Sequence, residues 1–395
     1  MLEALRSGAW LTPTRARAYP LLLIAVFVVG IIAALVTAHG VIDSTGRPLG
    51  SDFSLLWAAG RSVQNGDPAL PYDLARFAAL QRQIFGADTP ILGWLYPPYF
   101  LAIAAMVALL PYLWALLVWQ GATLALYAAT IYRILPDRWV LIAALGFPGV
   151  IINIGHGHNG FLTAFLLGGG LLALDRRPWI AGMFFALLAY KPQFALVLPI
   201  ALLADKRYVA LLSAAIGVAL ITLGTVWAFG LQSWIAFRGS MDFTRTVVLE
   251  QGSTGWQKIQ SSFAAVRALG GSVELAYAVQ GAVTVAVVLG VAWLWHSKSN
   301  RRLQYAALIT GALLATPYVL DYDMVVLAPA LAFVLSHGRE LGFRPWQKTI
   351  MAGVYVAPFV TRMVADAILV PVGLLAMLAF FVMVVGRAWG DLQRR

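Results

Sequence analysis

Long apolar runs, separated by short polar segments, fill most of this chain. The first run covers residues 21–38, and comparable runs follow one another from residue 96 to the C-terminus. At 1.5 Å per residue, a helix of about 20 residues crosses the hydrocarbon core of a bilayer, which is about 30 Å thick. The pattern therefore predicts an all-α, polytopic transmembrane protein, with one membrane domain covering residues 1–395.

The N-terminal run has two interpretations. A signal peptide also combines basic residues with an apolar stretch, and Arg15 and Arg17 precede this run. However, no small-residue cleavage site closes the run, and further apolar runs follow it. We therefore expect residues 21–38 to be the first span, entering from the cytoplasm.

Basic residues predict how the spans are oriented, because Lys and Arg accumulate in short cytoplasmic loops. Six segments have this character: RILPDR at 133–138, DRRP at 175–178, DKR at 205–207, HSKSNRR at 296–302, residues 337–348, and the C-terminal pair at 394–395. Between successive basic segments the chain must cross the membrane and return. This arrangement predicts about twelve spans, with both termini in the cytoplasm.

The external side is then predicted to carry polar turns and two long loops. The turns are GHGHNG at 155–160, YKPQ at 190–193, TPYVLDYD at 316–323, and residues 361–366; the loops cover residues 39–95 and 230–272. One stretch, 96–132, either crosses twice or crosses once after a re-entrant or interfacial helix. We expect the single crossing, because two crossings would place the later basic segments outside.

The composition supports a membrane protein and excludes several classes of function. Hydrophobic residues make up 61% of the chain and charged residues 11%, whereas about a quarter of a soluble domain is charged. The chain has no cysteine, which excludes disulfides and cysteine-based metal or redox sites. The net charge is +11, but the basic residues are spread through short loops and form no continuous face for nucleic acid.

The unusual polar residues collect on the predicted external side. They are Asp52, His156, His158, Asn159, Lys191, Gln193, Asp321 and Asp323. A charged group at membrane depth costs at least about 2.5–3.5 kcal/mol, so such residues are functional candidates by default.

Each of these residues also has a structural interpretation. Asp52 follows GS and precedes an apolar helix, so its carboxylate could cap that helix. Lys191 could extend its amine to the membrane interface, and the pair Asp321 and Asp323 could be solvated at a turn. If each residue had only a structural role, however, such residues should occur on both sides of the membrane, and these are all predicted on one side. We therefore expect them to line one cavity.

Four segments together resemble glycosyltransferase family 87. They are SDFSLLWAAGRSVQNGDPALPYD at 51–73, YPP at 96–98, GHGHNGFLTAFLLGGGLLAL at 155–174, and AGMFFALLAYKPQ at 181–193. The resemblance covers about the first 210 residues, and its order and spacing are more specific than any one segment. His158 stands where the family has a glutamine-like residue, and LDYD at 320–323 has no aligned family pattern.

The resemblance implies a membrane glycosyltransferase of the GT-C architecture that uses a polyprenyl-phosphate-linked sugar. It implies transfer of a hexose, with mannose as the first candidate, to a glycolipid or envelope-glycan hydroxyl. The active site is then expected on the external face of a bacterial-type plasma (inner) membrane. The family's catalytic base is an aspartate early in the first external loop, which corresponds to Asp52 here. A carboxylate in that position suits deprotonation of the acceptor hydroxyl.

The donor's phosphate leaves with negative charge, which cations at the membrane boundary would stabilise. The candidates for this role are Lys191, His156, His158, Arg238 and Arg245. Further candidate substrate-binding residues are Asn159, Gln193, Tyr96, Asp321 and Asp323.

The spacing Asp321-x-Asp323 is also typical of soluble glycosyltransferases that hold a metal against a nucleotide sugar. Nucleotide sugars are cytoplasmic, and this pair is predicted on the external side. Carboxylates suit hard divalent cations, but we expect no metal site and no cofactor.

Two other classes of protein fit parts of this pattern. A secondary transporter or a lipid-linked-sugar translocase would also combine buried charges with helices interrupted at Pro148 and Pro192. The chain shows no internal repeat, and its long polar insertions are both predicted outside. A non-catalytic scaffold would leave Asp52 and Lys191 without a role. The transferase is therefore the expected function, and the transporter or translocase is the alternative.

Overall fold

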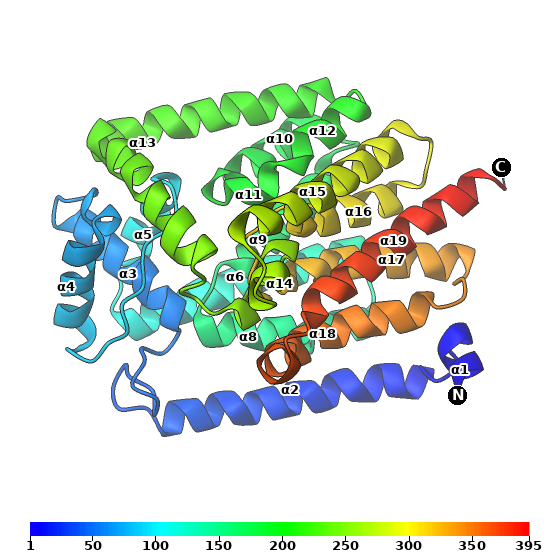
Figure 1. Ribbon diagram of the computed structural model, residues 1–395, viewed down its shortest axis with the longest axis horizontal. Helices are drawn as coiled ribbons and strands as arrows, with labels where there is room; N and C mark the ends of the chain where they lie inside the picture. Colours follow the sequence, from blue (N-terminus) through cyan, green and yellow to red (C-terminus); the bar gives the residue numbers. More distant parts are fainter. Residues whose placement is uncertain (395) are drawn as a thin grey trace.

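The computed structural model describes residues 1–394 and confirms the all-α, polytopic fold (Figure 1). The α-helices are α1 (Leu2–Ser7), α2 (Pro13–Val36), α3 (Ser51–Gln64), α4 (Leu74–Phe85), α5 (Tyr99–Val107), α6 (Tyr112–Ile134), α7 (Arg138–Leu145), α8 (Pro148–His156), α9 (Gly160–Ala173), α10 (Pro178–Leu187), α11 (Pro192–Ala195), α12 (Val197–Ala204), α13 (Tyr208–Phe243), α14 (Ser262–Ala268), α15 (Val273–His296), α16 (Arg301–Leu314), α17 (Leu327–Leu341), α18 (Gln347–Ile368) and α19 (Val372–Leu392). Shorter turns are the 3₁₀ helices η1 (Leu70–Tyr72), η2 (Leu188–Tyr190), η4 (Trp256–Lys258) and η5 (Asp321–Val326), and the π-helix η3 (Thr244–Glu250).

The number of spans is lower than twelve when only long helices are counted. Within the described residues, seven helices are long and apolar enough to cross a membrane, and eight if the bent pair α7 and α8 forms one span. Three shorter apolar helical segments, Gly160–Ala173, Pro178–Tyr190 and Pro192–Ala204, lie between the long ones. The structure therefore does not confirm twelve full spans. Short and broken helices at membrane depth are tolerated where other protein segments surround them.

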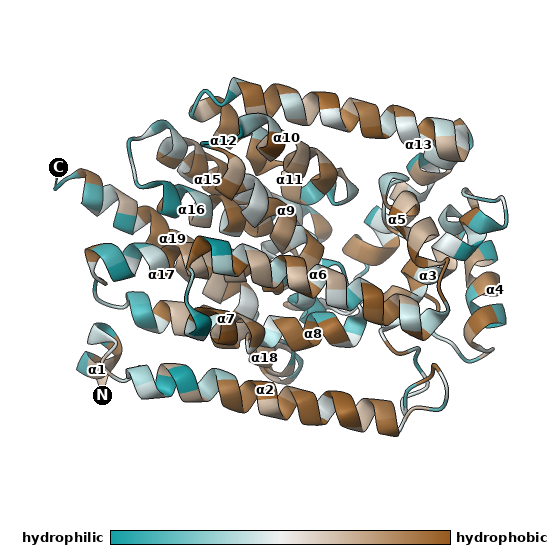
Figure 2. Ribbon diagram, turned by 180° about the vertical axis from the view of Figure 1, so that it is seen from behind, coloured by the Kyte–Doolittle hydropathy of each residue, from teal (hydrophilic) through white to brown (hydrophobic). Residues whose placement is uncertain are grey.

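The two termini lie at the same end of the molecule, as the prediction of both on one side requires (Figures 1 and 2). Helices α2 and α13 form opposite outer edges and are brown, hence apolar, over much of their length in Figure 2. Only 11% of the apolar stretch of α2 and 17% of that of α13 are buried inside the protein. Such long apolar faces without a protein partner are typical of contact with lipid.

The end opposite the termini is built from the predicted first external loop and the helix that follows it (Figure 1). This loop contains α3 and α4, and α5 comes directly after it. With nine residues, α5 is about 14 Å long at 1.5 Å per residue, so it cannot cross a bilayer. This length agrees with the single crossing predicted for residues 96–132, which α6 then provides.

Two segments predicted outside the spans contain helix in the structure. Part of the loop predicted at 230–272 continues α13, which bends at Gly230 (φ 74°) and runs on to Phe243. The turn predicted at 361–366 is wrong, because α18 continues to Ile368. Its polar residues do not break the helix because they have partners: the Thr361 hydroxyl donates to Gln260 Oε1 at 2.6 Å, and Arg362 binds Asp321.

The first test concerns orientation. Because the chain has no cysteine, single-cysteine variants give clean labelling. Ser44→Cys and Ser253→Cys, both at exposed positions, should react with an impermeant maleimide in intact cells, whereas Arg176→Cys should react only after permeabilisation. Protection of position 253 in intact cells would contradict the predicted orientation.

Candidate active site

Two glycine turns bring the first loop against the membrane helices. Gly50 precedes α3 with φ 69°, and Gly157 ends α8 with φ 62°. Residues other than glycine rarely adopt this left-handed backbone conformation. A Cβ atom on Gly157 would lie 2.5 Å from Phe53 Cβ and 3.3 Å from Gly50 Cα. The first residues of α3 therefore lie directly beside the last residue of α8.

Asp52 and His156 face each other across this contact. Asp52 Oδ1 lies 3.6 Å from His156 Nδ1, and the two side chains are 22% and 20% exposed. The Ser51 hydroxyl lies 3.0 Å from His156 Nδ1 and donates to Asp52 Oδ1 at 3.4 Å. Gly50 occupies the N-cap position of α3, with no side-chain cap. The carboxylate of Asp52 thus makes side-chain contacts and does not act as the cap.

A cavity of about 380 Å³ opens beside this pair. Its lining residues are Asp43, Thr45, Arg47, Pro48, Ser51, Ile152, Gly155, His156, Asp321, Pro358, Phe359, Arg362 and Met363. These residues come from the first loop, α8, η5 and α18, which are far apart in sequence. Part of the wall is apolar and open, since Phe359 and Met363 are 50% and 68% exposed.

Three cations collect around this cavity. Arg362 donates to Asp321 Oδ2 from Nε at 2.9 Å and from Nη2 at 2.5 Å. Arg47 lines the same cavity. Burial, together with the charges of Arg362 and Arg47, lowers the pKa of Lys258 in the neighbouring turn η4. The carboxylates of Asp43 and Asp321 line the same cavity, so an anion bound there would compete with Asp321 for the Arg362 guanidinium.

The two aspartates of the LDYD segment point to different partners. Asp321 binds Arg362 at the cavity, whereas Asp323 Oδ1 accepts from Lys191 Nζ at 2.6 Å in an ion pair whose side chains are each only 4% exposed. Asp323 also accepts the backbone N–H of Leu320 at 3.0 Å. Because each carboxylate already has a cation partner, this geometry does not resemble a paired-aspartate metal site.

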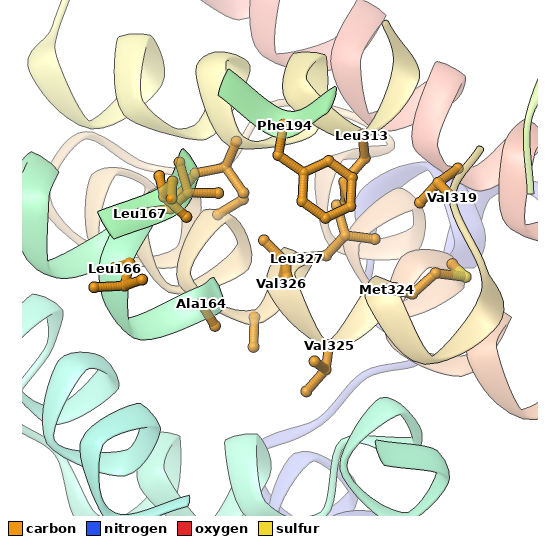
Figure 3. Packing of buried hydrophobic residues seen from close by; sticks show 14 of the residues in the cluster. Ala164, Leu166, Leu167, Phe194, Leu313, Val319, Met324, Val325, Val326 and Leu327 are labelled. Atoms are coloured by element: carbon orange, nitrogen blue, oxygen red, sulfur yellow. The ribbon is translucent and has the colours of Figure 1, made fainter. Parts of the chain in front are cut away.

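An apolar floor fixes the LDYD segment in place (Figure 3). Met324, Val325 and Val326, which follow it directly, are fully buried. They lie among side chains of α9 and α11, including Leu167 and Phe194 (Figure 3). Packing at this density leaves little freedom for the turn above it.

Tyr322 separates the cavity from a second, buried group of polar residues. Its ring stacks on His158 at 3.8 Å and meets His156 edge-on at 5.3 Å, both between ring centroids. The hydroxyl of Tyr96 accepts from Asn159 Nδ2 at 2.8 Å and lies 3.1 Å from His158 Nε2. Burial, with the nearby Lys191 and His156, holds the pKa of His158 well below its usual value, so its neutral Nε2 can accept a hydrogen bond from the Tyr96 hydroxyl.

Asp52 also acts on this buried group. Burial and then the Asp52 carboxylate raise the pKa of Tyr96 well above its usual value. The same two causes raise the pKa of Tyr318. Asp52 therefore lies between the cavity and an aromatic interior.

The candidates named from the sequence divide into two groups. Most of them lie in or beside the cavity or in the buried group: Asp52, His156, His158, Asn159, Tyr96, Lys191, Asp321 and Asp323. Gln193 is half-buried beside Lys191. Arg238 and Arg245 are exposed on the last part of α13 and on η3, and Arg245 pairs with Asp242 and Glu250.

Sequence reasoning missed three cations, Arg47, Lys258 and Arg362. Arg47 and Lys258 lie in loops, where basic residues are common. Arg362 did carry a signal, because it interrupts the apolar run of α18, and a charge at membrane depth is a functional candidate.

Comparison with known proteins gives one match. The sequence model of glycosyltransferase family 87 matches residues 94–320, more than half of the chain. His156, His158, Lys191 and Asp321 lie within or directly at the edge of this match, whereas Asp52 and Arg362 lie outside it. No curated protein and no solved structure matches the chain.

The buried ion pair generates a stability prediction. Lys191→Met leaves the Asp323 carboxylate buried without its cation, which should lower the free energy of unfolding by about 3–5 kcal/mol. The double variant Lys191→Met/Asp323→Asn removes both charges, keeps an oxygen that can accept the Leu320 N–H, and should recover most of the loss. Thermal unfolding in detergent measures both.

The exposed pair of Arg76 and Asp67, at 2.6 Å, is the matched control. Arg76→Met should change stability by about 0–1 kcal/mol. Equal effects of Lys191→Met and Arg76→Met would show that the buried pair does not hold the LDYD turn.

Proposed function

Because the chain belongs to glycosyltransferase family 87, we propose that it transfers a hexose, with mannose as the first candidate, from a polyprenyl-phosphate-linked donor to a hydroxyl of a glycolipid or envelope glycan. The reaction takes place on the external face of a bacterial-type plasma (inner) membrane. The observation that carries the proposal is the cavity that places Arg47 and Arg362 next to the Asp52–His156 pair and opens on exposed apolar residues.

The cations of the cavity bind the donor's phosphate. A guanidinium group can bind a phosphate with two parallel, charge-assisted hydrogen bonds. Arg362 pairs with Asp321, and the donor's phosphate replaces or extends that pairing. The exposed side chains of Phe359 and Met363 give the polyprenyl chain an apolar path from the membrane to the phosphate.

Asp52 acts as the general base. It takes the proton of the acceptor hydroxyl while the acceptor oxygen forms a bond to the anomeric carbon of the sugar. The bond from that carbon to the phosphate oxygen breaks, and the polyprenyl phosphate leaves with the electron pair. The cavity cations stabilise this developing charge.

The direct test uses the purified protein in lipid nanodiscs with labelled polyprenyl-phosphate sugars and a membrane lipid extract. Transfer of label from one donor to an extractable lipid or glycan supports the proposal. Movement of intact donor across a vesicle membrane, without cleavage, would instead identify a translocase.

Asp52→Asn should remove transfer without unfolding the protein. The amide cannot accept the proton, so transfer should fall by at least about 100-fold, the low end of general-base contributions. Asp67→Asn, which changes another acid of the same loop, should retain activity. Near-native transfer by Asp52→Asn would move the search for the base to Asp321 or Asp323.

Arg362→Gln should weaken use of the donor. Loss of a charged contact to the departing phosphate should lower kcat/KM for the donor by about 100-fold or more. Two control variants accompany this substitution. Arg339→Gln breaks another Arg–Asp pair, the one with Asp137 at 2.7 Å, elsewhere in the chain. Asp321→Asn/Arg362→Gln also removes the charge of Asp321, which Arg362→Gln alone leaves without its cation. Native donor kinetics in Arg362→Gln, or equal losses in Arg339→Gln, would contradict the phosphate assignment.

A further inference from the structure

We propose that His156 and Ser51 are positioning residues that hold one oxygen of Asp52, so that its other oxygen faces the acceptor hydroxyl. This inference rests on the proposed function, because it assigns roles around the base of that reaction. It also gives His156 a role different from that of a donor-phosphate ligand, which the sequence suggested.

The contacts among His156, Ser51 and Asp52 form a chain of hydrogen bonds. A serine hydroxyl has a single proton, and Ser51 donates it to Asp52 Oδ1 at 3.4 Å. The Ser51 oxygen is then free to accept, and His156 Nδ1 lies 3.0 Å from it. In the tautomer that carries its proton on Nδ1, His156 donates to Ser51, which in turn donates to Asp52.

The backbone keeps the members of this chain in place. Ser51 and Asp52 are the first two residues of α3, and His156 is the last residue of α8. The glycine turns at Gly50 and Gly157 allow these two helix ends to touch. A donor N–H is also favoured at a helix C-terminus, where the backbone carbonyls are unpaired.

His156 is held on its other side as well. The Tyr322 ring meets it edge-on, with 5.3 Å between ring centroids, and Tyr322 itself is stacked on the buried His158. The imidazole therefore lies between the α3 terminus and the fixed LDYD segment. In this position it can orient Ser51 without leaving the wall of the cavity.

Holding one carboxylate oxygen has a direct consequence for the reaction. Among residues 1–394, both the Ser51 hydrogen bond and the His156 contact at 3.6 Å reach Asp52 at Oδ1, which leaves Oδ2 for the substrate. The acceptor's O–H bond breaks, its proton passes to Oδ2, and its oxygen forms the new bond to the anomeric carbon. A carboxylate free to rotate would lose this geometry, and a misplacement of 1 Å can cost about 100-fold in rate.

Two substitutions at position 156 separate the atoms involved. An asparagine amide nitrogen is bonded to Cγ, as Nδ1 is, so His156→Asn keeps a donor near Ser51. A glutamine amide lies one atom further out, near the position of Nε2, so His156→Gln loses that donor. We expect His156→Gln to lower kcat by about 10- to 100-fold with an unchanged donor KM, and His156→Asn to recover most of that loss.

The readouts distinguish positioning from phosphate binding and from folding. A rise in donor KM in His156→Gln, with kcat unchanged, would overturn the proposal and assign His156 to the phosphate. Equal losses in His156→Asn and His156→Gln would overturn it too, because the donor at Nδ1 would then be irrelevant. Thermal unfolding of both variants shows whether a loss reflects folding.

A double variant makes the dependence on Asp52 explicit. If His156 acts only through Asp52, His156→Gln should have no further effect on transfer in the Asp52→Asn protein. Ser51→Ala should behave in the same way, because it removes the middle of the chain. If the fold-loss of the double variant equals the product of the fold-losses of the two single variants, the proposal is contradicted.

The same series separates failure of this inference from failure of the proposed function. Absence of labelled product with the native protein would reject the proposed function itself. Loss in Asp52→Asn combined with native transfer in His156→Gln and Ser51→Ala would leave the proposed function standing and reject only the positioning role.

Discussion

The contact between the glycine turns at Gly50 and Gly157 is the constraint on which the site depends. It joins a loop that precedes the bundle to a helix end within it, and no larger residue fits at Gly157 without moving Phe53. This backbone contact places the side chains of Ser51 and Asp52 opposite His156. Local backbone geometry, more than any single strong bond, thus assembles the acid and the imidazole.

The LDYD segment connects the open side of the site to its interior. Asp321 forms an ion pair with Arg362 at the cavity, and Asp323 forms one with Lys191 in the interior. Tyr322 lies between them and contacts both histidines. A buried ion pair adds little net stability, but removing one partner is costly, so the Lys191–Asp323 pair strongly favours this one arrangement of the turn.

Much of the fold could be predicted from sequence because apolar runs and basic loops follow directly from the bilayer. The same reasoning placed Asp52, His156 and Asp321 on one side, where the structure brings them together. The count of twelve spans was not confirmed for a physical reason: α9 and the two segments after it are apolar but shorter than a full span, and hydropathy alone does not show where a helix ends. Arg47 and Arg362 meet only through tertiary packing of the first loop against α18, which no local pattern encodes.

The most direct test of the account is a cryo-electron microscopy structure of the protein with a non-cleavable polyprenyl phosphonate sugar. The account predicts density for the phosphonate between Arg47 and Arg362, the lipid chain along Phe359 and Met363, and the sugar's anomeric carbon on the side of Asp52. Donor density at the end that carries the termini, with this cavity empty, would contradict it.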